Sequence, residues 1–382
     1  MKICYVHHSY YPGNVPFYVH TQELARLGAE VYAMALRREG EPPEERVGQV
    51  WVMRVLDYSR SLGSAYLRFS RFLSSAYRTL QRLDRLDIVH MRNLPGVSLF
   101  PLLARSRARA WVLGIYSPPL HPKLRSWFSN LRIRAEARAF DVTLVHRQAV
   151  GEAIFGHSAS RFVENPIGVD FDHFRPGRNI VLRQKLGVSS EETLLIYTGS
   201  VQPKRTLHKM LAGFAQANAS LAHLHLVIVG DGTDLPRLRA LADDMDITER
   251  VHFQGYVPYA RMPAYMQAAD IGLCYVPVTP WYDKAPVLKT MESMASGLPT
   301  IATATQGNRA YIKNEENGLL VEDSPDDLAA AIVRLCHCDA LRHRCAENGR
   351  DSIRAYDWHR IVEDILLPTY IELSGQRQGL SR

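Results

Sequence analysis

The sequence has few cysteines and no long apolar run. Its five cysteines are an odd number in a chain of 382 residues, which argues against a disulfide framework. No apolar run is as long as a membrane-spanning helix, and the first residues lack the long apolar region of a signal peptide. These absences argue against an integral membrane protein and against a small secreted domain, so we expect a cytoplasmic protein.

Patterns that bind metal ions are also scarce. Three cysteines and two histidines gather in residues 336–345, but their spacing matches no standard zinc pattern. Asp170 and Asp172 are spaced like a metal-binding pair, although a linker turn also favours aspartate. The chain offers no other clear cluster of oxygen ligands. We therefore expect neither a metal ion nor a cofactor.

The charge balance is positive. The chain has 46 lysines and arginines against 39 aspartates and glutamates, a net charge of +7. Such an excess favours an anionic partner, for example a nucleotide or a lipid surface. The positive charge is not joined to a recognisable nucleic-acid module, so we expect no nucleic acid. The length predicts two domains.

The N-terminal half alternates short apolar strands with helices, which is how an open parallel sheet begins. A loop rich in Pro, Gly and Asn is expected at 10–17, a helix at 20–27 and a charged loop at 39–46. The predicted strands are 2–7, 30–36, 50–55, 86–90, 110–116, 141–146 and 161–166.

Polar residues just beyond these strands are candidates for contact with a substrate, because ligands bind parallel sheets beyond the carboxyl ends of the strands. The candidates are Asn14, His90, Arg92, Tyr116 and His121. Each is equally compatible with a loop residue that takes no part in chemistry.

Residues 59–85 are unusually basic and amphipathic. Six apolar or aromatic side chains between Leu67 and Leu80 are interleaved with arginines. Such a helix is suited to an anionic membrane surface. The alternative is a surface helix that packs on the sheet and extends its arginines into water. A second basic stretch, 123–138, carries Trp127 and Phe128.

A second series of strands and helices begins near residue 193. We expect strands at 194–198, 224–229, 251–254 and 271–276, with helices at 207–218, 235–244 and 262–268. Glycines end several of these strands and let a ligand approach the backbone closely. The run Gly230-Asp231-Gly232 lacks the third glycine of a dinucleotide fingerprint, so a dinucleotide is not indicated. Helices at 326–335, 339–354 and 356–373 follow.

The segment 285–302 carries the sharpest functional signal. We expect a helix at 288–296 that ends at Gly297, with Glu292 in its first turn and Lys289 close to its start. Free N–H groups at a helix start bind anions, and a nearby carboxylate can accept two hydrogen bonds from a ribose diol. The alternative is that Glu292 only complements the helix dipole.

Taken together, these residues resemble the retaining nucleotide-sugar glycosyltransferases of family 4, also called group 1. The similarity covers most of the chain and is strongest from Asn165 to Gly318. The matching stretches are 165–170, 197–200 with Lys204 and Arg205, 226–232, 251–258, 292–299 and 316–318.

The resemblance implies an α/β fold of the GT-B type, with two facing Rossmann-like domains, parallel sheets and a C-terminal helix that crosses back to the first domain. We expect an acceptor-side domain at 1–172, a nucleotide-sugar domain at 173–354, and a crossover helix and tail at 355–382. The enzyme would transfer a sugar from a UDP- or GDP-sugar with retention and without a metal. The acceptor would be a glycan, a lipid-linked molecule or a small molecule, and the protein could sit peripherally on the inner face of the membrane.

The resemblance also assigns roles to residues. Arg205 and Lys204 would stabilise the departing diphosphate, and His121 is the candidate for catalysis at the acceptor side. Glu292 would hold the ribose. The expected donor-binding residues are Gly199, Ser200, Gly230, Tyr256, Val257, Lys284, Lys289 and Glu292.

Two departures from the family pattern stand out. Lys284, with Asp283 beside it, occupies a position where the family often has a glutamate, and the family's N-terminal Gly-Gly is replaced near 15–17. These departures keep two alternatives open. One is a different enzyme of this architecture, such as an epimerase or phosphorylase, and the other is a catalytically degenerate subunit that binds nucleotide sugars.

Overall fold

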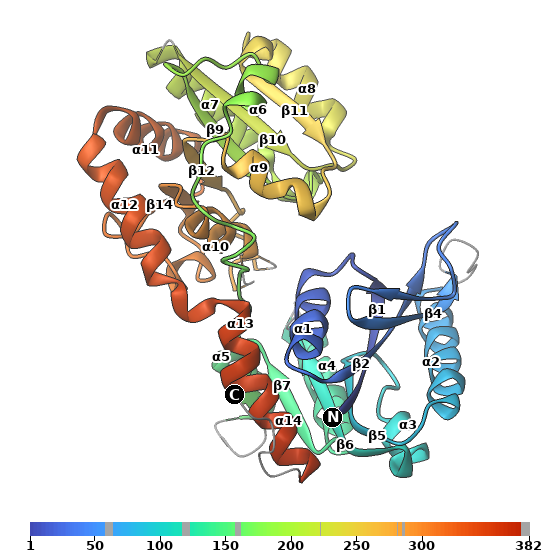
Figure 1. Cartoon of the computed structure of the whole chain (residues 1–382). Helices are drawn as coiled ribbons and strands as arrows, with labels where there is room; N and C mark the ends of the chain where they lie inside the picture. Colours follow the sequence, from blue (N-terminus) through green and yellow to red (C-terminus); the bar gives the residue numbers. More distant parts are fainter. Residues whose placement is uncertain are drawn as a thin grey trace. The chain divides into compact units, whose positions relative to one another are not determined.

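The computed structural model describes residues 1–57, 64–116, 123–156, 162–221, 223–280, 282–284 and 287–375 (Figure 1). The chain divides into two compact units, which we describe separately. Unit 1 contains Met1–Ile167 and Trp358–Arg382, and unit 2 contains Gly168–Asp357. The divisions lie a few residues from the boundaries at 172 and 354 that we expected. Each unit is an α/β fold built on a parallel sheet, as the resemblance implied.

The sheet of unit 1 has the strand order β3-β4-β2-β1-β5-β6-β7-β8. Its strands are β1 (Lys2–Tyr10), β2 (Glu30–Arg37), β3 (Glu44–Val47), β4 (Val50–Asp57), β5 (Leu86–Arg92), β6 (Ala108–Ile115), β7 (Val142–Val145) and β8 (Val163–Glu164). The charged loop expected at 39–46 was partly wrong, because β3 pairs antiparallel with β4. Gly48 adopts a φ of +59° in the two-residue turn between them, which a tight hairpin requires.

The helices of unit 1 are α1 (Val15–Arg26), α2 (Ala65–Arg82), α3 (Leu99–Leu103), α4 (Lys123–Ala137) and α5 (Gln148–Phe155). Helix α1 begins earlier than the predicted residue 20. Asn14 Oδ1 accepts the Phe17 N–H at 3.2 Å and caps the helix, and Pro16 fits its first turn. The predicted helix 59–85 corresponds to α2, and residues 59–63 lie outside the described residues.

Two apolar cores lie on opposite faces of this sheet. Helices α2, α3, α4 and α5 contribute to one core, and α1 contributes to the other. The chain end joins α1 there through α13 (Trp358–Ile361), a π-helical turn (Val362–Leu366) and α14 (Leu367–Ser374). The π turn ends two residues before Pro368, whose missing N–H interrupts the α-helical hydrogen bonds. The predicted last helix therefore exists, begins at Trp358 and packs on unit 1.

The sheet of unit 2 is parallel throughout, with the order β11-β10-β9-β12-β13-β14. Its strands are β9 (Thr193–Thr198), β10 (Leu224–Val229), β11 (Val251–Gly255), β12 (Ile271–Cys274), β13 (Thr300–Thr303) and β14 (Leu319–Val321). Its helices are α6 (Ile180–Lys185), α7 (Leu207–Ser220), α8 (Leu235–Asp244), α9 (Met262–Met266), α10 (Leu288–Ala295), α11 (Pro325–His337) and α12 (Asp339–Ser352). The strand order reverses between β9 and β12, and ligands bind beyond the carboxyl ends of strands at such a point.

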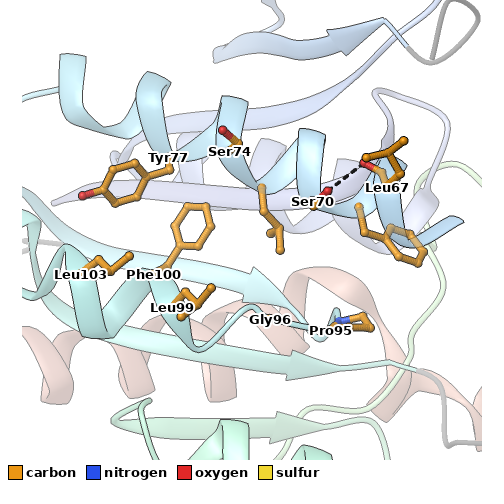
Figure 2. A pocket seen from close by; sticks show the side chains of 11 residues that line it. Leu67, Ser70, Ser74, Tyr77, Pro95, Gly96, Leu99, Phe100 and Leu103 are labelled. Atoms are coloured by element: carbon orange, nitrogen blue, oxygen red, sulfur yellow. Dashed lines mark hydrogen bonds between the residues drawn. The ribbon is translucent and has the colours of Figure 1, made fainter. Parts of the chain in front are cut away.

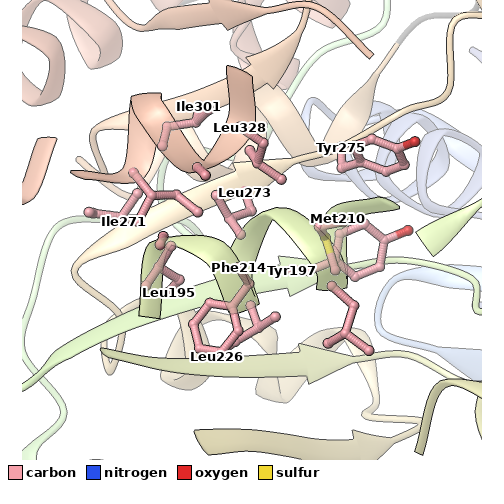
Figure 3. Packing of buried hydrophobic residues seen from close by; sticks show 14 of the residues in the cluster. Leu195, Tyr197, Met210, Phe214, Leu226, Ile271, Leu273, Tyr275, Ile301 and Leu328 are labelled. Carbon is pink, nitrogen blue, oxygen red and sulfur yellow. The ribbon is translucent and has the colours of Figure 1, made fainter. Parts of the chain in front are cut away.

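The core of unit 2 anchors these strand ends. Leu195, Leu226 and Ile271 on neighbouring strands are buried with Met210 and Phe214 of α7 (Figure 3). The same cluster contains Tyr197 and Tyr275, which end or follow β9 and β12. The loops that follow these strands therefore start from a rigid base.

Candidate active site

Three glycine-bearing loops of unit 2 pack against one another at the carboxyl edge of the sheet. Gly199 N–H donates to the Val229 carbonyl at 3.0 Å, and Gly230 N–H donates to the Gly255 carbonyl at 2.9 Å. A Cβ atom on Gly230 would lie 1.8 Å from the Gly199 carbonyl oxygen. Gly230 is thus required for the packing of two loops. A Cβ on Gly199 would instead lie 3.1 Å from Lys289 Nζ, so this glycine keeps the space beside a lysine open.

Two cationic side chains are held at this edge by aromatic rings. The Arg205 guanidinium lies 4.2 Å from the centre of the Tyr282 ring, and its Nε donates to Ser200 Oγ at 3.3 Å. Lys289 Nζ lies 4.0 Å from the centre of the Tyr197 ring. Lys204, in contrast, is exposed. The structure therefore brings together Gly199, Ser200, Arg205 and Lys289 and leaves Lys204 at the surface.

A strained residue fixes the position of Arg205. Thr206 follows the 3-10 turn Pro203–Arg205 and has a φ of +49°, which is unfavourable for a β-branched residue. Its hydroxyl shares a 3.1 Å hydrogen bond with Tyr275, whose own hydroxyl donates to Asp323 at 2.7 Å. This network was not predicted from the sequence. A threonine directly after two basic residues was the available signal, but its partners lie far along the chain.

The electrostatics of the site favour an anion. Burial, followed by the nearby Arg205 charge, lowers the pKa of Lys289 to about 7. Burial also raises the pKa of Glu292 to about 7, although Lys289 opposes the rise. A bound diphosphate would offset the crowding of the two cations and favour the charged form of Lys289. The positive charge of the site is thus not fully compensated until an anion binds.

Glu292 lies in the second turn of α10, and our expectation of the first turn was wrong. Helix α10 begins at Leu288, and it has no acidic residue in its first turn. The dipole effect fades within the first turn, which weakens the alternative that Glu292 only complements the helix. Among the residues that the structure describes, no hydrogen-bond donor is paired with this carboxylate.

The end of α10 is built as the sequence predicted. Gly297 has a φ of +74°, and its N–H donates to the Met294 carbonyl at 3.0 Å. The Leu298 N–H donates to the Ser293 carbonyl at 3.1 Å, which completes a Schellman motif. The Ser293 hydroxyl shares a 2.8 Å hydrogen bond with Thr300 on β13. Glu292 and Lys289 therefore sit on a helix that is anchored to the sheet.

The remaining donor-side candidates differ in what they offer. Tyr256 is 74% exposed and Val257 is half-buried after β11, so the backbone there is accessible. Lys284 is exposed. The neighbouring Asp283 carboxylate accepts the Gln306 backbone N–H at 2.9 Å and its side-chain amide at 2.7 Å. Asp283 is thus occupied in holding the loop after β13 and does not replace the absent glutamate.

A second polar cluster lies in unit 1. His90 is buried, its Nδ1 is 2.5 Å from the Tyr370 hydroxyl, and its Nε2 is 2.9 Å from the Tyr116 hydroxyl. Arg92 Nη1 is 3.5 Å from His7 Nε2. Burial holds the pKa of His90 well below its usual value, so the ring is neutral. The structure joins His90, Tyr116 and Arg92 and adds Tyr370 from the chain end.

Asn14 and His121 are the remaining acceptor-side candidates. Asn14 serves as the N-cap of α1, and His121 lies outside the described residues. The sequence analysis missed His20, which is 1% exposed and has both ring nitrogens without a partner among the described residues. Burial lowers its pKa to about 3. An unpaired buried imidazole is uncommon in folded proteins and is a signal for ligand contact.

Metal-ligand geometry is not found in the part of the chain that the structure describes. No group of three or more His, Cys, Asp or Glu side chains there could hold a metal ion. Asp170 Oδ1 accepts the backbone N–H groups of Asp172 and His173 at 3.0 and 2.8 Å, as in a linker turn.

Comparison with known families decides the assignment. The model of the glycosyl transferases group 1 matches residues 179–352, and the model of glycosyltransferase family 4 matches residues 17–173. The chain belongs to the group 1, family 4 glycosyltransferases. The first model covers Arg205, Lys289 and Glu292, and the second covers His90 and Tyr116.

Curated glycosyltransferases of this family are similar over part or most of the chain. A D-inositol 3-phosphate glycosyltransferase of Geodermatophilus obscurus is 29% identical over 222 residues, which are 56% of this chain and 48% of that protein. A phosphatidyl-myo-inositol mannosyltransferase of Mycobacterium leprae is 26% identical over 315 residues, which are 79% of this chain and 78% of that protein. The chain spans about half the length of the inositol-phosphate glycosyltransferases that it matches.

Solved glycosyltransferase structures share the fold. A sucrose-phosphate synthase from Thermosynechococcus elongatus has a TM-score of 0.78 at 18% identity, over 99% of this chain and 100% of that chain. The Anabaena protein HepE, solved in complex with UDP-glucose, has a TM-score of 0.72 at 18% identity, over 97% of this chain and 99% of that chain. At this identity the likeness supports the GT-B fold and no finer property.

Proposed function

We propose that this glycosyltransferase moves a sugar from a nucleotide-diphosphate sugar to a hydroxyl acceptor, with retention of the anomeric configuration and without a metal ion. One observation carries the donor assignment: Arg205 and Lys289 are held around Gly199 at the switch point of the sheet. They lie beside the Glu292 carboxylate, which has no paired donor among the described residues. The complex of the structurally similar HepE with UDP-glucose supports this class of donor.

The cations would act on the leaving group. In the reaction, the bond between the anomeric carbon and the diphosphate oxygen breaks, and the acceptor oxygen forms a bond to that carbon. Arg205 and Lys289 would stabilise the charge that develops on the diphosphate. The acceptor proton would pass to the departing phosphate. The exposed Lys204 would add charge near this point but no fixed contact.

The rest of the nucleotide would extend along the strand ends. Glu292 would accept two hydrogen bonds from the ribose diol, which requires its ionised form. Ser200 and Gly230 would border the diphosphate, and the backbone at Tyr256 and Val257 would meet the base. Lys284 would face the sugar end, where the glutamate that is frequent in the family is absent.

The acceptor would be met by unit 1. Because His90 uses both ring nitrogens in hydrogen bonds, we propose that it positions Tyr116 and does not act as a base. Arg92 would contact an anionic group of the acceptor. The names of the relatives that act on inositol phosphate and phosphatidyl-inositol support a polyol acceptor, which would be free or lipid-linked.

We also propose a peripheral location on an anionic membrane through α2. The exposed arginines of this helix support it. No helix in the described part of the chain is long and apolar enough to span a membrane.

A donor screen tests the proposal most directly. Thermal unfolding is measured with a panel of UDP- and GDP-sugars, and the stabilising donor is then incubated with polyol and lipid-linked acceptors. We expect one donor to raise Tm and a product with the donor's anomeric configuration by NMR. Turnover of the donor without any acceptor would instead indicate an epimerase. Donor binding without transfer to any acceptor would indicate a degenerate binding subunit, a reading that the occupied Asp283 keeps open.

A further inference from the structure

An apolar groove runs between α2 and α3 on unit 1. It has a volume of about 700 Å³, and Figure 2 shows the side chains that line it. Leu67, Leu73 and Tyr77 line it from α2, and Leu99, Phe100 and Leu103 line it from α3. None of the described side chains that line the groove is charged, so its walls suit a hydrocarbon and not a polar ligand.

The walls of the groove are joined by a ring contact within the lining and by hydrogen bonds beside it. The rings of Tyr77 on α2 and Phe100 on α3 meet edge to face with their centres 5.9 Å apart. The Gly96 N–H at the start of the α3 segment donates to Glu136 of α4 at 2.8 Å, and Arg132 holds the same carboxylate at 3.0 Å. Ser70 on the α2 wall donates its hydroxyl to the Leu67 carbonyl at 3.0 Å, so this polar atom is satisfied locally. The walls are therefore fixed before any ligand arrives.

The rim of the groove exposes large apolar side chains to solvent. Leu67 is 43% exposed, Leu99 54% and Leu103 66%. Contiguous exposed apolar residues that rim a cavity mark a site of contact with a ligand or membrane. Trp127 and Phe128, each 58% exposed, lie on α4, which covers the same face of the sheet. Helices α2 and α4 both follow strands of the parallel sheet, so both begin at its carboxyl edge.

The charge beside the groove selects an anionic partner. Helix α2 contains four arginines and no acidic residue. Arg71 and Arg78 are exposed and lie three and four residues from Ser74, which lines the groove. Residues at this spacing share one face of a helix, so both arginines flank the rim. An anionic headgroup at the rim would meet these charges while a chain entered the groove.

We infer that this groove binds one hydrocarbon chain of an anionic bilayer lipid, with Arg71 and Arg78 at its headgroup. This is a binding site, and it goes beyond a general contact between a basic helix and a membrane. It is separate from the donor site and does not depend on the proposed reaction. A bilayer bound in this way would bring the carboxyl edge of unit 1 close to lipid-linked acceptors.

The test uses the full chain, without donor or acceptor. Binding is measured by flotation with vesicles of phosphatidylcholine alone and of phosphatidylcholine mixed with an equal amount of phosphatidylglycerol. The phosphatidylglycerol carries a photoreactive diazirine in its acyl chain. After irradiation, mass spectrometry identifies the labelled peptides. We expect binding only with phosphatidylglycerol, weakened by salt, and labels in 67–77 and 95–103. Labels confined to α4 or to unit 2 would overturn the inference.

Matched variants distinguish binding of a lipid chain in the groove from simple insertion of α3 into the bilayer. Leu103→Asp places a charge in the groove lining, and Leu102→Asp places it on the neighbouring residue, which is 68% exposed and not part of the lining. We expect vesicle binding to fall about tenfold for Leu103→Asp and to change little for Leu102→Asp. An equal loss of vesicle binding in both variants would indicate simple insertion of α3 into the bilayer. It would overturn the inference that the groove binds a lipid chain.

A groove-filling variant gives a second, independent readout. Ser74→Phe adds apolar surface and leaves both arginines in place. A chain in the groove predicts weaker binding and loss of the acyl-chain label, whereas simple surface insertion predicts equal or stronger binding. Arg78→Gln should weaken binding to phosphatidylglycerol vesicles severalfold. The donor-induced shift in Tm should stay as in the unaltered protein for all four variants, so failure of this inference is distinguishable from failure of the proposed reaction.

Discussion

The paired titration of Lys289 and Glu292 gives the most discriminating prediction for the donor site. Both groups have a pKa of about 7 before donor binds. In the proposed mode of donor binding, Lys289 must be protonated to bind the diphosphate, and Glu292 must be ionised to bind the ribose. Below pH 7 the glutamate loses its charge, and above pH 7 the lysine loses its charge. Donor affinity should therefore be bell-shaped in pH, with its maximum near neutrality.

The slope of donor affinity against pH follows from the linkage between proton binding and ligand binding. Beyond its pKa, each group must be recharged at a cost of about 1.4 kcal/mol per pH unit, so affinity should fall up to about tenfold per unit on each side. Each limb flattens where the pKa of the same group in the complex is reached. Isothermal titration calorimetry with the donor sugar, whose diester phosphates stay ionised throughout, measures this profile directly.

Two variants show which residue causes the acid limb of the pH profile and which causes the alkaline limb. Glu292→Gln should remove the acid limb, and its maximum affinity should fall by roughly 1.5–3 kcal/mol, because a neutral amide oxygen is a weaker acceptor. Lys289→Arg should remove the alkaline limb, because arginine stays charged. Glu191→Gln, an exposed change before β9, serves as the control and should keep both limbs. A flat profile for the unaltered protein, or both limbs in Glu292→Gln, would refute the reasoning.

Three further predictions concern other parts of the site. Arg205→Ala should lower kcat about a hundredfold with little change in donor affinity, because in the proposed reaction the guanidinium stabilises the departing charge. Lys204→Ala, at an exposed residue, should lower kcat less than about fivefold. Equal losses of affinity and kcat in Arg205→Ala would contradict the proposed role. Gly230→Ala should lower the free energy of unfolding by about 1–3 kcal/mol, measured by urea unfolding, since its Cβ would lie 1.8 Å from the Gly199 carbonyl. Chelation by EDTA should leave turnover unchanged, and loss of activity that added Mg²⁺ restores would refute a metal-free reaction.

Several site residues could be predicted because their signals are local. Gly297 after a short apolar helix marks a helix end, and a glycine at the end of an apolar strand marks a loop at the binding edge. Together with the other matching stretches between Asn165 and Gly318, they carry the family resemblance. The turn expected for Glu292 was wrong. The predicted start of the helix at residue 288 agrees with α10, and from that start Glu292 is the fifth helical residue, so it belongs to the second turn and not to the first.

Residues whose partners lie far along the chain could not be found from sequence. Tyr370 reaches His90 and Tyr5 only because α14 packs on the sheet of unit 1. Asn14 is a different case, because its partner Phe17 is close in the sequence: its capping role was not predicted because α1 begins at Val15 and not at residue 20. Asp283 was considered beside a missing glutamate, and only the folded loop shows that Gln306 occupies it.

The sequence alone indicated the class of the protein: two α/β units, strand ends that carry glycines, and a short helix that carries Lys289 and Glu292. These features depend on periodicity and on backbone conformations that particular residues favour, and both act over a few positions. Only the tertiary structure decided which cations are held, how burial moves two pKa values to about 7, and that α2 and α3 leave an apolar groove between them. Burial and long-range pairing are properties of the packed chain, because they depend on which distant segments exclude water from a side chain.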